Sequence, residues 1–182
     1  MRYLKDKDIA AALQQEPPLV EGVTDLATQL QPNGIDLTVA AIVRVSGAAH
    51  VGFSGDETRP APAETLEFDA EGWLFLPRGN YRARIAERVN IPPDVVGFAR
   101  ARSTMIRNGV SVNTAIWDSG YSGYSEVGLV VHNEQGLYLK RGARILQMYF
   151  FQLDDAVDKA YSGRYQGENI TIPSPHRGRG PG

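Results

Sequence analysis

The first hydrophobic pattern along the chain is that of an amphipathic helix. Leu4, Ile9 and Leu13 fall near one face, charged residues lie between them, and alanines fill the middle of the segment. Pro17 and Pro18 follow, and proline cannot donate the backbone hydrogen bond that a helix needs. The pattern predicts one N-terminal helix from Leu4 to Leu13.

Beyond this point the chain changes to short segments rich in Val, Ile, Phe and Tyr, separated by Gly, Pro, Asn or Asp. Such segments predict β-strands divided by turns. The predicted strands are Ile35–Val45, Trp73–Leu76, Tyr81–Ala86, Val95–Arg100, Val110–Ala115, Val127–Val131 and Ala143–Leu153. Many short strands at this spacing favour an all-β fold, a distorted jelly roll or β-barrel, over alternating strands and helices.

Three further segments complete the expected architecture. A short internal helix is predicted over Ser103–Asn108 and should end at Gly109. Residues 46–63 are rich in Gly, Pro and Ala and should form a surface excursion, and residues 173–182 should form a flexible C-terminal tail. A chain of 182 residues can bury one sizeable core, so we expect a single domain over residues 1–172.

Composition and charge exclude several classes of site. The chain has no cysteine, which excludes disulfides and thiolate metal sites, and its three histidines lack metal-ligand spacing. We therefore expect neither a histidine zinc site nor a Ser-His-Asp triad, and we assign no metal ligand to the chain. The net charge of −2 gives no general affinity for nucleic acid. A polyanionic ligand would need a few placed arginines.

The sequence also predicts where the protein resides. No stretch approaches the roughly 18–20 apolar residues of a membrane span. The N-terminus carries acidic residues where a signal peptide would be apolar. We expect a cytoplasmic protein that does not associate with membranes.

The first chemical motif lies at the start of the internal helix. The hydroxyl groups of Ser103 and Thr104 are flanked by Arg102 and Arg107. A helix N-terminus offers unpaired amides that suit phosphate oxygens, and Arg107 lies about one helical turn beyond Ser103. A capped helix with solvated arginines fits the same residues, so spacing alone leaves both interpretations open.

The second motif is a glycine-containing turn after an apolar strand. Asp118 ends the strand, Gly120 and Gly123 permit a tight reversal, and Tyr121 and Tyr124 project from the turn. A carboxylate fixed there can orient and deprotonate a water molecule, and a tyrosine beside it can stack on a sugar or base. A hairpin in which the aspartate merely caps the turn is the alternative.

Two further signals are less specific. Arg144 and Gln147 interrupt an apolar strand, where each needs a partner in a ligand, in the core or in another subunit. Beyond the last strand, a polar segment rich in glycine contains Tyr161, Arg164 and Gln166. Such a segment either folds over a bound ligand or forms a loose tail.

Taken in order, these motifs resemble one family, the deoxyuridine triphosphatase and deoxycytidine triphosphate deaminase superfamily. The resemblance extends from about residue 4 to residue 167, and the motifs are specific together, whereas each alone is not. The matching segments are Leu4-Lys-Asp-Lys-Asp-Ile for the deaminase-type opening helix, Gln31-Pro-Asn-Gly-Ile-Asp-Leu for the first motif, Leu76-Pro-Arg-Gly and Glu87-Arg-Val-Asn-Ile-Pro-Pro-Asp for the central strands, and Arg102-Ser-Thr with Arg107 for the phosphate-binding motif.

The resemblance implies a homotrimer of distorted jelly rolls with a nucleotide site between subunits, and Mg²⁺ held mainly by the triphosphate and water. It implies that Asp118 holds the attacking water and that Tyr121 packs under the deoxyribose and excludes a 2′-hydroxyl. The other implied contacts are to the phosphates by Arg102, Ser103, Thr104 and Arg107, to the base by backbone groups of Asn113, Thr114 and Ala115, to or near the phosphates by Arg144 and Gln147, and across the closed site by Tyr161, Arg164 and Gln166.

The family contains two reactions, and one position separates them. The deaminases carry a proton-shuttling glutamate five residues past the last turn glycine, whereas here the fifth residue after Gly123 is Gly128. Glu126 shares the strand parity of that position, so a shifted register would make it a second catalytic acid. Glu168 stands where deaminase relatives usually have glutamine, and it marks either a different base contact or nothing.

We therefore expect hydrolysis of dUTP to dUMP and pyrophosphate, because this reaction needs only Asp118 and not the missing glutamate. The turn Asp118-Ser-Gly-Tyr-Ser-Gly-Tyr-Ser-Glu is similar to that of the archaeal-type deoxyuridine triphosphatases. Two alternatives stay open. One is a dCTP deaminase, alone or with dUTP hydrolysis, and the other is a non-catalytic nucleotide-binding β-domain.

Overall fold

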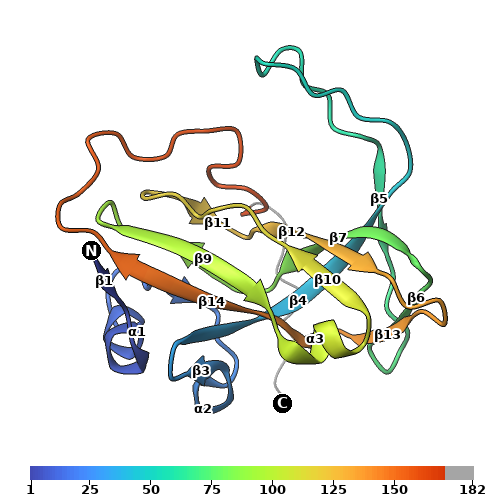
Figure 1. Ribbon diagram of the computed structural model, residues 1–182, viewed down its shortest axis with the longest axis horizontal. Coiled ribbons are helices and arrows are strands. Elements are labelled where there is room, and N and C mark those ends of the chain that lie inside the picture. Colours follow the sequence, from blue (N-terminus) through green and yellow to red (C-terminus); the bar gives the residue numbers. More distant parts are fainter. Residues whose placement is uncertain (171–182) are drawn as a thin grey trace, which may run out of the picture.

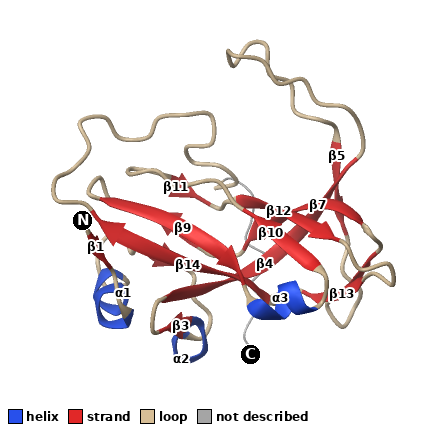
Figure 2. Cartoon of the chain, viewed as in Figure 1, coloured by secondary structure: helices blue, strands red, loops and turns tan. Residues whose placement is uncertain are grey.

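The computed structural model describes residues 1–170 of the chain, and within them β-strands dominate (Figure 2). The helices are α1 (Asp6–Ala12), α2 (Leu26–Gln29) and α3 (Ser103–Arg107). The strands are β1 (Arg2–Tyr3), β2 (Val20–Glu21), β3 (Leu30–Gln31), β4 (Gly34–Val45), β5 (Ala63–Leu66), β6 (Trp73–Leu76), β7 (Gly79–Ile85), β8 (Arg88–Asn90), β9 (Val95–Ala101), β10 (Val110–Asn113), β11 (Ser122–Gly123), β12 (Glu126–Val131), β13 (Leu137–Lys140) and β14 (Arg144–Gln152). The expected all-β fold is confirmed.

One large antiparallel sheet organises the molecule. Its main path runs β1-β14-β4-β7-β12-β10, with β9 added to β14 and with β3 and β5 added to β4. The sheet is strongly curled into a half-barrel, and two small sheets, β11-β8-β2 and β13-β6, lie beside it (Figure 1). The long strands β4 and β14 pair through the middle of this sheet, so residues distant in sequence meet there.

The core lies on the inner face of the curled sheet. Along β12 the buried residues alternate, with Val127, Leu129 and Val131 facing inward, as expected for a strand with one covered face. Strand β4 differs because its first seven residues are all buried, including the polar Asp36 and Thr38. Buried polar side chains in a central strand need hydrogen-bond partners, and this strand supplies part of the candidate site.

The observed helices agree only in part with those that the sequence predicts. The predicted N-terminal helix exists as the shorter α1, which buries Ile9 completely. The internal helix α3 is also present, and Gly109 follows it with a φ of +69°, as its helix-ending role predicts. Helix α2 is not predicted, because four residues are too few to show periodicity. Its one local signal is Asp25, whose carboxylate accepts a hydrogen bond from the backbone N–H of Thr28 at 3.2 Å. No helix in residues 1–170 has the length and hydropathy needed to span a membrane.

All seven predicted strands exist, with ends shifted by at most two residues. Strand β10 ends two residues earlier than predicted, at Asn113, so Thr114 and Ala115 lie in the loop that leads to Asp118. The sequence does not predict seven further strands of two to four residues each, which are β1, β2, β3, β5, β8, β11 and β13.

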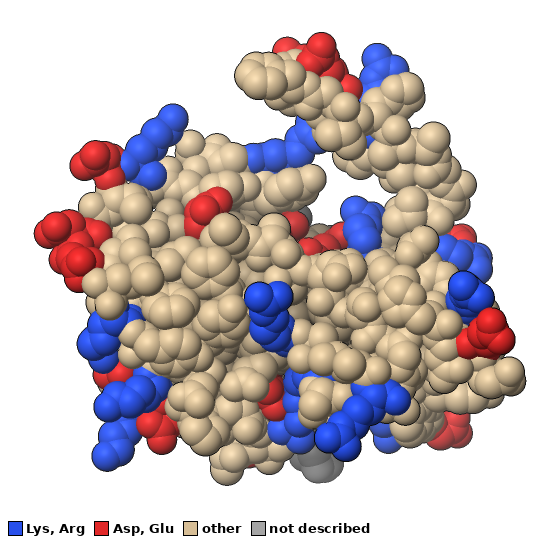
Figure 3. Space-filling model, in the orientation of Figure 1, with Lys and Arg blue, Asp and Glu red and all other residues tan. Residues whose placement is uncertain are grey.

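Residues 46–62, here called the arm, connect β4 to β5. The arm stands away from the body of the molecule at the upper right of Figures 1 and 3, as expected for a surface excursion. One isolated bridge, between His50 and Arg59, joins its two sides, and Phe53 near its tip is fully exposed. The expected C-terminal tail lies outside the described residues.

Candidate functional site

The candidate site is built on the turn that follows Trp117. Backbone hydrogen bonds of 2.9 and 3.0 Å join Trp117 to Gly97 of β9 and fix the start of the turn. The hydroxyl of Ser119 donates to the carbonyl of Val95 at 2.7 Å, and Gly120 has a φ of +90°, a conformation that favours glycine. These contacts fix the backbone on both sides of Asp118 and leave its side chain exposed.

A cavity of 370 Å³ lies against this turn, within the size range of small-molecule sites. One wall comes from the loop before the turn and the other from the start of β12. Tyr161, Tyr165 and Glu168, from the segment after β14, complete the lining. The lining residues are Arg82, Ala115, Ile116, Trp117, Asp118, Tyr121, Ser125, Glu126, Val127, Tyr161, Tyr165 and Glu168. A second hollow of 510 Å³ adjoins it and shares Asp118 and Tyr161.

Charged groups of both signs meet at the cavity. One carboxylate oxygen of Glu126 accepts from the Arg84 guanidinium at 3.1 Å, and the other lies 3.3 Å from Nη1 of Arg82. Glu126 is therefore held by two guanidinium groups instead of pointing freely at a ligand. Burial and the negative charge of Glu126 raise the pKa of Glu168, while Tyr121 and the two arginines oppose this shift.

Tyr121 is the central buried side chain of the cavity wall. Its hydroxyl lies 2.8 Å from Oγ of Ser125 and 2.8 Å from Oε1 of Glu168. Its ring packs edge-on against Tyr161, with ring centroids 5.9 Å apart. Burial raises the pKa of the Tyr121 phenol, so its hydroxyl keeps its proton throughout the physiological range. Tyr121 can thus donate a hydrogen bond but cannot act as a base.

The closing segment, residues 161–170, lies along this turn. The side chain of Gln166 donates to the carbonyl of Gly120 at 2.9 Å and accepts from the N–H of Ser122 at 3.0 Å. Arg164 points elsewhere, and its guanidinium donates to the carbonyl of Gly55 in the arm at 3.0 Å. Tyr161 therefore lines the cavity, Gln166 fastens the segment to the turn, and Arg164 links the segment to the arm.

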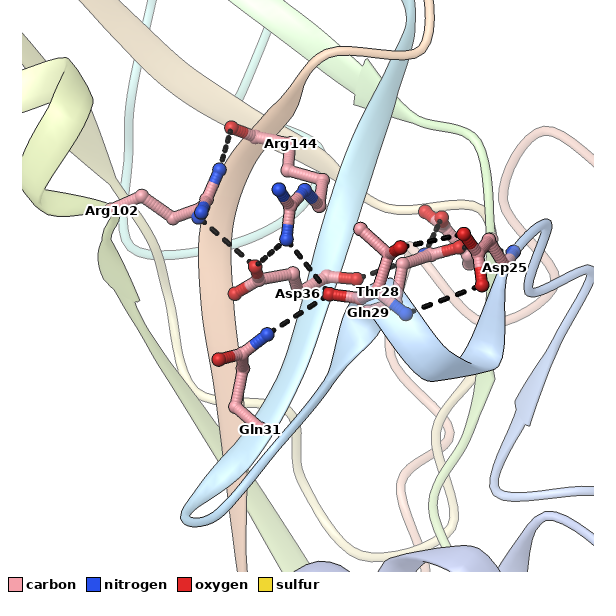
Figure 4. Close-up of polar contacts among 8 residues, drawn as sticks. Asp25, Thr28, Gln29, Gln31, Asp36, Arg102 and Arg144 are labelled. Atoms are coloured by element: carbon pink, nitrogen blue, oxygen red, sulfur yellow. Dashed lines mark hydrogen bonds and ion pairs between the residues drawn. The ribbon is translucent and has the colours of Figure 1, made fainter.

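A second polar group lies around the start of β14 (Figure 4). The buried carboxylate of Asp36 on β4 lies 3.0 Å from both Nε of Arg102 and Nη1 of Arg144. Arg144 also donates to the carbonyl of Thr28 at 2.8 Å. Two cations share one anion here, so the group keeps a positive charge, and both arginine side chains stay partly exposed.

A fully buried acid lies beneath this pair of arginines. Glu87 accepts hydrogen bonds from the N–H of Thr38 at 2.9 Å, from the Thr38 hydroxyl at 2.8 Å and from Nε2 of Gln29 at 2.7 Å. Gln29 also donates to the backbone carbonyl of Asp36 at 3.0 Å. Burial raises the pKa of Glu87 against these hydrogen bonds. The network fixes the strand that presents Asp36 to the arginines.

The other expected phosphate contacts gather near the same group. Ser103, Thr104 and Arg107 lie on the exposed side of α3. Gln147 on β14 is paired with Asp36 across the sheet, and its amide donates to the carbonyl of Asn33 at 3.1 Å. These residues surround a basic surface, but none of them lines the cavity beside Asp118.

One chain therefore holds two separate sets of expected site residues. Trp117 is bridged to Gly97, so Asp118 lies beside the start of β9, whereas Arg102 follows its end. A strand rises ~3.3 Å per residue, which places Arg102 about 20 Å from Asp118. No single nucleotide phosphate can contact both within one chain at this separation.

The sequence identifies five of the twelve residues that line the cavity. Of the predicted residues, Ala115, Asp118, Tyr121, Glu126 and Tyr161 line it. Asn113 and Thr114 precede it without lining it. Asn113 pairs with Gly128, and Thr114 contacts the carbonyl of Ala99 at 3.4 Å. The lining residues that the sequence does not assign to the site are Arg82, Ile116, Trp117, Ser125, Val127, Tyr165 and Glu168. For Glu168 a signal existed in its departure from the family pattern.

A family model described as dCTP deaminase-like matches residues 3–153. The chain belongs to this family. A protein of Methanococcoides burtonii named probable deoxyuridine 5′-triphosphate nucleotidohydrolase is 43% identical over 170 residues, 93% of this chain and 100% of the relative. A protein of the same name from Archaeoglobus fulgidus is 44% identical over 170 residues, 93% of this chain and 99% of the relative.

The family fold is also found in a solved structure. The crystal structure of 2′-deoxycytidine 5′-triphosphate deaminase from Agrobacterium tumefaciens superposes with a TM-score of 0.63 at 21% identity. The match covers 82% of this chain and 48% of that chain, so the present chain spans about half the length of that protein. The likeness confirms the fold, while the choice between the two reactions rests on the residues of the cavity.

Proposed function

We propose that the protein hydrolyses dUTP to dUMP and pyrophosphate. The observation that carries this proposal is the placement of Asp118. Its exposed carboxylate adjoins a cavity of nucleoside size, and within residues 1–170 no hydrogen bond or ion pair occupies it. Relatives at 43–44% identity bear the name of this activity. The reaction would keep dUTP from DNA synthesis and supply dUMP for thymidylate.

Asp118 has the chemistry that the reaction needs. A carboxylate with free lone pairs can orient a water molecule and accept its proton as the water attacks the α-phosphorus, and pyrophosphate then leaves. Catalysis of this kind consists mainly of positioning and charge stabilisation. Tyr121 would pack under the deoxyribose, and backbone groups of residues 113–115 would contact the base.

The phosphate contacts would come from a neighbouring subunit. The basic group at Arg102, Ser103, Arg107 and Arg144 lies too far from Asp118 to act within one chain. In a homotrimer with sites between subunits, each cavity would face the basic group of the next chain. The separation of about 20 Å therefore supports shared sites, because a single chain is incomplete.

Mg²⁺ is the proposed cofactor. Residues 1–170 contain no cluster of three His, Asp or Glu side chains able to hold a metal ion. This donor set fits a cation that binds through the triphosphate and water, with at most one carboxylate such as Asp118 nearby, which is a common arrangement for Mg²⁺. Bound in this way, Mg²⁺ would neutralise phosphate charge.

Deamination of dCTP is the second candidate, and the presence of Glu126 in the cavity favours it. However, both oxygens of Glu126 are engaged by Arg82 and Arg84, and the deaminase glutamate position is Gly128. A carboxylate whose two oxygens both face guanidinium groups is poorly placed to exchange a proton with a bound base, because neither oxygen is directed at the ligand alone. Hydrolysis therefore agrees better with the site.

Two product assays on the purified protein separate the candidates. Incubation with dUTP and Mg²⁺ should release pyrophosphate, and incubation with dCTP should release no ammonia. Ammonia from dCTP would establish the deaminase instead. Release of neither pyrophosphate nor ammonia would favour a non-catalytic nucleotide-binding domain. Chelation with EDTA should abolish pyrophosphate release, and added Mg²⁺ should restore it.

A further inference from the structure

The hydroxyl of Tyr121 belongs to a hydrogen-bond chain with a defined direction. The indole N–H of Trp117 can only donate, and it lies 2.7 Å from Oγ of Ser125. Because the Tyr121 hydroxyl donates its hydrogen to Glu168, Ser125 accepts from the indole and donates its own hydrogen bond to the Tyr121 oxygen at 2.8 Å. Tyr121 then donates to Oε1 of Glu168 at 2.8 Å. The chain ends at the Glu168 carboxylate, which is the only member from outside the turn.

Backbone contacts hold Glu168 in place. The N–H of Tyr124 donates to the Glu168 carbonyl at 3.0 Å, and the N–H of Gly167 donates to the carbonyl of Ser122 at 2.8 Å. A Cβ at Gly123 would lie 2.8 Å from the Tyr121 hydroxyl and 3.1 Å from the Glu168 nitrogen. The closing segment therefore lies directly on the turn, without room for a side chain between them.

We propose that Glu168 is a positioning residue that holds the Tyr121 ring and thereby sets the preference for deoxyribose over ribose. This inference rests on the proposed function, in which Tyr121 packs under the sugar. A flat ring excludes an additional 2′-hydroxyl only if it cannot move aside. Two hydrogen bonds and the edge-on contact with Tyr161 fix the ring, and one of those bonds comes from Glu168.

The test compares dUTP with UTP, which differ only in the 2′-hydroxyl. For each variant, pyrophosphate release gives kcat/KM for both nucleotides. Glu168→Ala should lower the dUTP/UTP ratio about tenfold, the effect of losing one hydrogen bond to a charged group. Glu168→Gln retains an oxygen acceptor for Tyr121 and should keep the ratio within about twofold of wild type. Glu67→Gln, an exposed surface change, is the matched control.

A double-mutant cycle shows whether Glu168 acts through the tyrosine. Tyr121→Phe keeps the ring but removes the hydroxyl and both of its hydrogen bonds, so it should lower the ratio at least as much as Glu168→Ala does. The double variant should show no loss beyond that of Tyr121→Phe, because the bond to Glu168 is already absent there. If Glu168→Ala does not fold, Tyr121→Phe still tests whether the hydroxyl that bonds Glu168 sets the preference.

Calorimetric binding of dUMP and UMP provides a readout that does not need turnover, and the same variants should lose the preference for dUMP. Failure of the proposed function appears as wild-type protein without pyrophosphate release from dUTP. Failure of the positioning role appears differently. The positioning role of Glu168 is refuted if wild type shows no preference for the deoxyribonucleotides, or if Glu168→Ala retains the wild-type preference in either readout.

Discussion

The buried acid Glu87 provides a sharp test of the network beneath the arginine pair. Its carboxylate accepts three hydrogen bonds, with Oε2 facing the N–H of Thr38 and Oε1 facing the Thr38 hydroxyl and the Gln29 amide. Gln29 cannot turn its amide around, because its oxygen already accepts from the N–H groups of Thr24 and Asp25. Both sides of the carboxylate therefore require an acceptor.

Replacement by glutamine keeps the shape but supplies only one oxygen. In either orientation the new NH₂ group faces a donor, which is either the Thr38 N–H or Nε2 of Gln29. A buried donor left without a partner costs about 1–3 kcal/mol, and the loss of a buried charge offsets part of this. We expect Glu87→Gln to lower the free energy of unfolding by about 2 kcal/mol, a large share of a typical total.

Urea denaturation at fixed protein concentration, followed by tryptophan fluorescence, measures this change through the midpoint at constant m-value. The matched control is Glu71→Gln, because Glu71 is exposed, and it should change stability by less than about 0.5 kcal/mol. A Glu87→Gln variant as stable as wild type would refute the reasoning. It would mean that the gain from removing a buried charge equals the cost of the donor conflict.

Three more predictions follow from the same geometry. Burial raises the pKa of Glu87, so its contribution to stability is present at low pH and is lost as the pH rises through that pKa. The difference in unfolding free energy between wild type and Glu87→Gln, measured by the same denaturation, should therefore widen as the pH is lowered from neutral, and a difference that narrows would contradict this. A Cβ at Gly34 (φ +143°) would lie 2.3 Å from a backbone oxygen, whereas one at Gly142 (φ +78°) meets nothing within 4 Å. Thermal unfolding should therefore show that Gly34→Ala lowers the unfolding free energy by about 2 kcal/mol more than Gly142→Ala. Equal losses in the two variants would contradict the backbone approach described at Gly34. Asp118→Asn and Arg107→Ala chains, each inactive alone, should regain dUTP hydrolysis when co-expressed in one assembly, and no recovery would rule out shared sites.

The sequence predicts the long strands and the turn at Asp118 because their signals are local. A run without polar residues, Val127 to Val131, marks β12, and the spacing of Gly120 and Gly123 marks the reversal that exposes Asp118. Strand β1 carries no such signal, because its two residues become a strand only by pairing with the far end of β14. The four residues of α2 are likewise too few for a periodic pattern.

The same contrast between local signals and long-range contacts holds for the residues of the site. Asp118, Tyr121 and Glu126 lie within nine residues of one another, so one motif places them together. Glu168 reaches Tyr121 from 47 positions away, and Glu87 reaches Thr38 from 49. Such contacts depend on how the whole chain closes. The pairing of Arg102 with Asp36 is a contact of this kind, since it joins the end of β9 to the middle of the sheet.

The most direct test of the proposed reaction compares wild type with Asp118→Asn at saturating dUTP and Mg²⁺. Wild type should release dUMP and pyrophosphate in equal amounts. The variant should bind dUTP with unchanged affinity and lose about 10²–10⁴-fold in turnover, the usual contribution of a general base. Turnover by Asp118→Asn at the wild-type rate would contradict the account, because the group proposed to activate the water would then have no part in the reaction.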